Sequence, residues 1–267
     1  MTSSTKLDDA ANRFQPDGWG WRARIAVIAP DADFVPDAEM TAMAPDGVSI
    51  HATRVHLPSG TQLSGDEPID LAALRAYVTP PLLDDAAGLL AAGPASVIAH
   101  AFTSTSYVGG DGDDETLRAR LEQRTLGIPV VTTCVAATQA MGALGVDGIA
   151  LVHPPWVSDH INSIGAEYFR RRGVHVVTAV SVPLHAGPRE IEVGDVYDWV
   201  RLNTPVDAAA VFLAGNGFRT VSLIDALEAE LGRPVVSANQ ALLWAALCAA
   251  DVRCEIVGYG QLFNHRA

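Results

Sequence analysis

The stretch VFLAGNGFRTVSLIDALEAELG, residues 211–232, joins a short apolar run, a two-glycine turn and a helical pattern. Its apolar run has the length and composition of a buried strand, and the periodic apolar residues after the turn predict an amphipathic helix. In an α/β protein, ligands bind beyond the carboxyl ends of such strands. Gly215, Asn216 and Gly217 therefore mark a candidate ligand site, although none of them is a nucleophile, an acid or a base.

The same strand–helix unit recurs along the chain and predicts an α/β fold with parallel strands. A first set of units ends near residue 147 and a second set follows it, which predicts a pseudo-duplicated architecture. Polar turns end the corresponding strands at 102–106 and 214–217, so both turns are expected to line one site between the halves. The predicted strands are 24–30, 48–57, 95–102, 128–134, 148–155, 174–182, 208–215 and 233–239.

The predicted organisation has three parts. Residues 1–23 form a polar N-terminal arm, residues 24–147 the first α/β half, and residues 148–267 the second half. The C-terminal segment is expected to pack back onto the first half.

Composition limits the classes of partner. The chain has 267 residues, with 18 Lys and Arg against 31 Asp and Glu, a formal net charge of −13. This acidic balance argues against nucleic acid and against an anionic membrane surface, because both attract basic patches. Three cysteines without CxxC spacing, and no secretory signal, predict reduced thiols in a cytoplasmic protein. No apolar stretch reaches the roughly 20 residues of a membrane span.

Several catalytic and binding motifs are absent from the sequence. The glycine-rich VGGDGDD (108–114) lacks the lysine of a phosphate loop and carries acidic residues that would repel phosphate. The histidines show neither HxH nor HExxH spacing, so no metal site is expected. No GxSxG motif supports an α/β-hydrolase.

The stretch FTSTS (102–106) is more informative. The hydroxyls of Thr103 and Ser104, with free backbone N–H groups ahead of a helix, form a cluster of hydrogen-bond donors. Such a cluster suits a carboxylate, or the dianion that forms when charge flows into it. The same hydroxyls could instead cap the next helix. Both interpretations remain open on residue types alone.

Five stretches resemble one family of enzymes. They are LGRPVVSANQALLWAAL (231–247), GYGQLF (258–263), HAFTSTSYVGG (100–110), LGIPVVTTCVAATQAMGALGV (126–146) and IAPDADFVPDAEM (28–40), the last of which fits the family's first strand and the loop after it. Together they resemble the Asp/Glu racemase superfamily, in its maleate isomerase and arylmalonate decarboxylase branch. The resemblance covers about residues 24–263 and is most specific near the C-terminus.

The resemblance implies two flavodoxin-like halves with the active site in a cleft between them and no cofactor. In this family a cysteine from one or both half-sites handles the proton or adds to the substrate. Phe102 and Gly215 stand at those two positions here, so both cysteines are replaced. The resemblance places Trp156, or a residue next to it, where the family has a tyrosine.

What remains of the family site is the part that would cradle an anion. The implied substrate-binding residues are Phe102, Thr103, Ser104, Trp156, Gly215, Asn216 and Gly217. Phe102 either fills the pocket, which predicts lost activity, or forms an apolar wall, which predicts a changed substrate.

Two residues are candidates for the missing acid or base. Asp33 follows the first strand and could serve as a general base, or could cap its loop. Cys134 lies where a strand enters a helix, a position that stabilises a thiolate, or it is a small buried residue. We expect Asp33 to be the better candidate and Cys134 to be structural.

Two functions follow. The first is a cofactor-independent isomerase or decarboxylase of a small carboxylic acid. The second is a relative that binds a small ligand without turnover. Both give the chain a small carboxylate as its partner, and both allow a homodimer.

Overall fold

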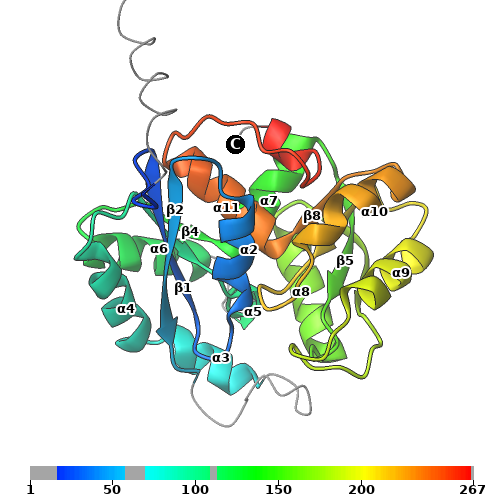
Figure 1. Ribbon diagram of the computed structural model, residues 1–267. Helices are drawn as coiled ribbons and strands as arrows, with labels where there is room; N and C mark the ends of the chain where they lie inside the picture. Colours follow the sequence, from blue (N-terminus) through cyan, green and yellow to red (C-terminus); the bar gives the residue numbers. More distant parts are fainter. Residues whose placement is uncertain (1–16, 58–69, 109–112, 266–267) are drawn as a thin grey trace, which may run out of the picture.

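The computed structural model describes residues 17–57, 70–108 and 113–265. It contains two four-stranded parallel sheets, one in each half of the chain (Figure 1). The strand orders are β2-β1-β3-β4 and β6-β5-β7-β8. The strands are β1 (Ala23–Pro30), β2 (Val48–Val55), β3 (Val97–His100), β4 (Val130–Thr132), β5 (Gly148–His153), β6 (His175–Ser181), β7 (Ala210–Leu213) and β8 (Val235–Ser237).

The two strand orders are equivalent. Each sheet places its first strand beside its second and third, and adds its fourth beyond the third. β3 of the first half therefore corresponds to β7 of the second. The segments that follow these two strands, 101–106 and 214–218, occupy matching places in the two halves. The predicted α/β fold with two pseudo-symmetric halves is confirmed.

Burial explains why these segments form strands. Every residue of β3, β5 and β7 is buried. Parallel strands are covered by helices on both faces, so they read as continuous apolar runs instead of alternating ones. The helices are α2 (Val35–Met43), α3 (Leu71–Val78), α4 (Leu82–Ala91), α5 (Thr103–Val108), α6 (Asp113–Arg124), α7 (Thr133–Leu144), α8 (Asp159–Arg171), α9 (Val193–Asn203), α10 (Ile224–Leu231) and α11 (Ala238–Ala249).

Local signals fix several helix ends. Ser158 caps α8 by accepting a hydrogen bond from the Ile161 N–H. Ser237 and Gln240 form a capping box at the start of α11, in which each side chain satisfies a backbone N–H. Gly145 ends α7 in the left-handed conformation that glycine adopts without strain.

The last helix joins the two halves. α11 follows β8 of the second sheet but lies against β3, β4 and α7 of the first half, with α2 on another side. In Figure 1, α2 and α11 lie side by side between the two sheets. The buried apolar side chains of both halves form one continuous core.

The expected strands are all present, with ends that shift by a few residues. Two helices differ from the sequence expectation. Val35–Met43, expected as part of a loop, is helix α2, and the polar turn at 102–106 is largely the start of helix α5. The predicted N-terminal arm and the glycine-rich stretch 108–114 fall mostly outside the described residues.

Within the described ranges, no helix is long and apolar enough to cross a membrane. In the same part of the chain, no group of three or more His, Cys, Asp and Glu side chains could hold a metal ion.

Candidate active site

The side chain of Asn216 joins the two predicted half-sites. Its Oδ1 atom accepts hydrogen bonds from the Thr103 backbone N–H at 2.8 Å and from the Thr103 hydroxyl at 2.7 Å. The Thr133 hydroxyl lies 3.2 Å from the same oxygen and 3.1 Å from the His100 carbonyl, so its single hydrogen is shared between these two acceptors. Asn216 and both threonines are buried. The donor cluster predicted at Thr103 is therefore directed at an oxygen of the chain itself.

The amide nitrogen of Asn216 is held from the other side. It donates to Asn239 Oδ1 at 2.8 Å, while Asn239 Nδ2 donates to Glu39 Oε2 at 2.8 Å and to the Asn216 carbonyl at 2.9 Å. Glu39 Oε1 accepts from the backbone N–H groups of Thr220 and Val221 at 2.7 and 3.1 Å. This chain of bonds fixes which end of each amide carries oxygen, because only one orientation satisfies every partner.

Glu39 lies on α2 of the first half, and its partners lie in the second half. Burial raises the pKa of this carboxyl, while the hydrogen bonds from Asn239 and the two backbone N–H groups oppose the increase. Nothing in the sequence marked Glu39 as part of the site. The only available signal was Pro36, because proline favours the first turn of a helix and so predicts α2.

Gly215 has a backbone that requires glycine. Its φ is +99°, and an added Cβ atom would lie 3.0 Å from Pro154 Cδ. Its N–H donates to the Thr103 hydroxyl at 3.2 Å. A cysteine at this position would require Pro154 to shift.

Several hydrogen-bond donors of the two turns remain unused. Within the described ranges, the backbone N–H groups of Asn216 and Gly217 and the hydroxyl of Ser104 have no hydrogen-bond partner. Ser104 is 5% exposed, so its hydroxyl is nearly enclosed. Unlike the Thr103 donors, these groups are not bonded to another group of the described chain.

Asp33 reaches the second turn from the end of β1. Its Oδ1 atom accepts the Val35 N–H at 3.0 Å, which caps the start of α2. Its Oδ2 atom lies 3.1 Å from the place where a Cβ atom of Gly217 would stand. The carboxyl thus has one oxygen that caps the loop and one that faces the turn, which accommodates both roles considered from the sequence.

Burial raises the pKa of Asp33 to about 7. The Val35 N–H and the charge of Arg54 oppose this increase, and the negative charges of Asp37 and Glu39 add to it. Arg54 pairs with Asp37 at 2.6 Å. A carboxyl with a pKa near neutrality can both take and return a proton at physiological pH.

Cys134 has a different environment. It is 0% exposed, and its thiol donates to the Thr103 carbonyl at 3.4 Å. Burial, together with the negative charge of Asp114, raises its pKa well above the usual thiol value. The start of α7 therefore holds a neutral thiol, and not the thiolate that was the alternative interpretation of this position.

The two predicted aromatic residues lie in ring contacts. Phe102 is 8% exposed and meets Tyr77 edge-on at 5.1 Å between ring centroids, and Tyr77 stacks on His100 at 6.0 Å. Burial lowers the pKa of His100 to about 4, so its ring is neutral. Trp156 is 7% exposed and meets Phe218 edge-on at 6.1 Å.

A buried polar cluster beside Cys134 was not foreseen. The Tyr107 hydroxyl lies 3.0 Å from His153 Nε2. Asp114 accepts from the Ser106 hydroxyl at 2.8 Å and from the Tyr168 hydroxyl at 2.5 Å. Burial lowers the pKa of His153 to about 3, so the imidazole is neutral. These bonds connect α5 and α6 of the first half with β5 and α8 of the second.

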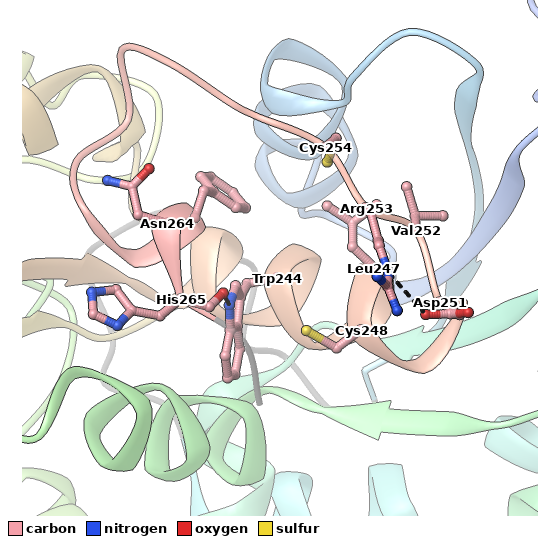
Figure 2. Close-up of a pocket in the computed structure, with 10 residues that line it drawn as sticks. Trp244, Leu247, Cys248, Asp251, Val252, Arg253, Cys254, Asn264 and His265 are labelled. Atoms are coloured by element: carbon pink, nitrogen blue, oxygen red, sulfur yellow. Dashed lines mark hydrogen bonds and ion pairs between the residues drawn. The ribbon is translucent and has the colours of Figure 1, made fainter.

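A separate cavity of about 490 Å³ lies between the end of α11 and the C-terminal segment (Figure 2). Cys248 and Cys254 both line it, and the Trp244 ring nitrogen donates to the His265 carbonyl at 2.9 Å beside it. No residue of the two turns or of the Asp33 loop lines this cavity. It is therefore distinct from the candidate active site.

Two parallel four-stranded sheets of equivalent strand order define a two-half α/β class of protein. The chain belongs to the arylmalonate decarboxylase family, whose model matches residues 69–263.

Individual relatives agree with this assignment. Arylmalonate decarboxylase of Bordetella bronchiseptica is 26% identical over 252 residues, which cover 89% of this chain and 95% of the relative. A crystal structure of arylmalonate decarboxylase is 26% identical, with a TM-score of 0.71 and coverage of 90% of this chain and 99% of that one.

The fold is also shared with maleate isomerases. The structure from Pseudomonas putida S16 has a TM-score of 0.78 at 20% identity and covers 90% of this chain and 98% of that one. The Nocardia farcinica maleate cis-trans isomerase, solved as a mutant with a covalently bound succinylcysteine intermediate, has a TM-score of 0.77 at 21% identity, with the same coverage of both chains.

Proposed function

We propose that this chain is a cofactor-independent enzyme that acts at the α-carbon of a small carboxylic acid, as a decarboxylase or an isomerase. Membership of the arylmalonate decarboxylase family supports the reaction class. The observation that carries the proposal is the Asp33 carboxyl, which is buried, faces Gly217 and has a pKa of about 7. It supplies an acid/base group beside a site whose two cysteine positions hold Phe102 and Gly215.

The unused donors give this site its anion-binding part. The substrate carboxylate accepts hydrogen bonds from the backbone N–H groups of Asn216 and Gly217 and from the Ser104 hydroxyl. The hydrogen bonds from these donors become stronger as negative charge moves into the carboxylate and an enediolate forms. Asp33 then takes or returns the proton at the adjacent carbon. Phe102 and Trp156 provide apolar surface for the rest of the substrate.

Cys134 has no role in this proton transfer. Its thiol is fully buried, is bonded to the Thr103 carbonyl and is held neutral. We propose that it packs the junction of β4 and α7.

The test is turnover by the purified chain. Arylmalonates are assayed for release of carbon dioxide, and arylacetates and small unsaturated acids for isomerisation or exchange of carbon-bound hydrogen in heavy water. Asp33→Asn keeps the size of the side chain and is expected to lower kcat by at least about 100-fold. Asp46→Asn, an exposed aspartate on the loop before β2, is the matched control and is expected to retain full activity.

Two results would overturn the proposal. One is the absence of turnover with every substrate of the panel. The other is an Asp33→Asn variant as active as the wild type.

The second candidate function is ligand binding without turnover. It is favoured by one observation, that the donors of Thr103 and Thr133 are already satisfied by Asn216. Under this alternative, calorimetry detects binding of a small carboxylate, while neither product nor hydrogen exchange is observed.

A further inference from the structure

The donor set around Asn216 Oδ1 has the form of an anion site. One backbone N–H and two hydroxyls, from Thr103 and Thr133, converge on a single oxygen. Convergent donors of this kind, enclosed by protein, normally receive a carboxylate oxygen or an oxyanion. Here they receive the neutral carbonyl of the chain's own amide. The position of one ligand oxygen is therefore already filled.

The occupant is firmly held. Asn216 is 3% exposed, and its nitrogen donates to Asn239 Oδ1. Asn239 in turn is fixed by the Glu39 carboxylate. A ligand oxygen could replace the amide carbonyl only if these bonds were broken together, because the amide cannot rotate without losing partners at both ends.

The surroundings also disfavour a second negative charge. Two buried carboxyls, Asp33 and Glu39, raise each other's electrostatic energy and would repel an added carboxylate. The cations that act on them are engaged elsewhere. Arg54 pairs with Asp37, and the Arg219 guanidinium donates to the Ile191 carbonyl. One carboxylate can use the free N–H groups of Asn216 and Gly217, whereas the Thr103 donors that could serve a second are already bonded to Asn216 Oδ1.

We propose that Asn216 is a specificity-determining residue that restricts this site to monocarboxylates by filling the place of a second anionic group. The inference rests on the proposed function, since it concerns the substrate of the same site. The restriction to monocarboxylates also decides between decarboxylation and isomerisation. A substrate with one carboxylate has no second carboxylate to lose, so the reaction is the movement of a proton on carbon.

The atoms and electrons of that step balance. The ionised Asp33 carboxylate takes a proton from the carbon next to the substrate carboxylate. The electron pair of the broken C–H bond enters the carboxylate and forms an enediolate. Return of the proton from Asp33 to carbon restores the carboxylate and the ionised Asp33, with nothing oxidised or reduced.

Binding of two matched probes tests the proposal. Phenylacetate and phenylmalonate share the same ring and differ by one carboxylate. Isothermal titration of the full chain is expected to show phenylacetate binding at least about tenfold more tightly than phenylmalonate. Asn216→Gly and Asn216→Ala remove the amide, and both are expected to increase phenylmalonate affinity by at least about tenfold, with phenylacetate changed by less than about threefold. Asn203→Ala, an exposed asparagine at the end of α9, is the control.

The outcomes are separable from those of the proposed function, because binding is measured without turnover. A chain that shows the selectivity but no hydrogen exchange supports the role of Asn216 and overturns the enzyme. Equal or tighter binding of phenylmalonate by the wild type overturns the role of Asn216. The role of Asn216 is also overturned if both variants are folded, as judged by circular dichroism, and neither gains affinity for phenylmalonate. If neither variant folds, the selectivity of the wild type alone decides.

Discussion

The backbone N–H and the hydroxyl of Thr103 both donate to one side-chain oxygen of Asn216, a residue 113 positions further along the chain. These two hydrogen bonds connect the start of α5, which follows β3, with the turn after β7, and these are equivalent places in the two halves. The contact is buried on both sides. It therefore ties the halves together at the point where the substrate is proposed to bind.

Loss of the Thr103 hydroxyl should destabilise the fold. Thr103→Val keeps the shape of the side chain but removes the donor to Asn216 and the acceptor for the Gly215 N–H. The free energy of unfolding is expected to fall by about 1–3 kcal/mol, because buried polar groups lose their partners. Urea unfolding measures this change. Thr138→Val, which removes a bond inside α7, should cost less than about 0.5 kcal/mol. Equal effects of both variants would contradict the prediction.

Asp33 should make stability depend on pH. Its pKa is raised from 3.8 to about 7 in the folded chain, so folding favours the protonated carboxyl. The folded state then binds more protons than the unfolded state between these values, and stability falls as pH rises from about 4 to 7. Asp33→Asn removes this dependence. Urea unfolding at about pH 5 and 8 should show the variant gaining stability relative to the wild type at the higher pH, by about 2.6 kcal/mol, because about two pH units of the titration lie between these values. A constant difference between the two proteins would refute the assignment.

Activity should follow the ionisation of the same group. Because Asp33 must be ionised to take a proton, kcat/KM is expected to fall about tenfold per pH unit below pH 7 and to level off above it. The pH–rate profile of the wild type tests this directly. A flat profile between about pH 5 and 8, in a range where the fold is intact, would show that another group handles the proton.

Gly217→Ala should affect the site more than the fold. Its backbone does not require glycine, but the added methyl group would lie 3.1 Å from Asp33 Oδ2, so the carboxyl must shift by a few tenths of an ångström. We expect kcat to fall by about tenfold or more, because a small displacement of a catalytic group is costly. Gly142→Ala, where an added Cβ meets nothing within 4 Å, is the matched control. An unchanged kcat in Gly217→Ala would show that Asp33 does not take part in the proton transfer.

Thiol labelling should distinguish the three cysteines. Cys134 is fully buried and neutral, whereas Cys248 and Cys254 are only partly buried and line one cavity. Thiolates react and neutral buried thiols do not. Native protein is therefore expected to react with Ellman's reagent at Cys248 and Cys254, and at Cys134 only after unfolding. Peptide mass spectrometry locates the label. Rapid modification of Cys134 in the native state would restore it as a candidate nucleophile.

The strands and the turn at 214–217 could be predicted because their signals are local. The apolar run that forms β7 is buried at every residue. Gly215 adopts a positive φ, a conformation that a glycine in a turn predicts. Cys134 was located correctly at the junction of β4 and α7, but the Thr103 carbonyl that accepts its thiol hydrogen and the Asp114 charge that helps to raise its pKa come from other parts of the chain.

The partner of the Thr103 donors could not be predicted. A threonine next to a helix start looks the same whether it binds a ligand or another side chain. Only the packing of the two halves brings Asn216 Oδ1 to Thr103, and only α2, which was expected as a loop, brings Glu39 to Asn239. Long-range pairs of polar residues have no periodicity to reveal them.

The path of α11 has a consequence for the order of folding. This helix is among the last elements of the chain, yet it lies against β3, β4 and α7 of the first half. A ribosome-bound chain that ends at residue 147 has the strands of its first sheet but not the helix that covers part of it. The first half must therefore keep apolar surface exposed until synthesis is nearly complete, and both halves are expected to gain their final stability in one late step.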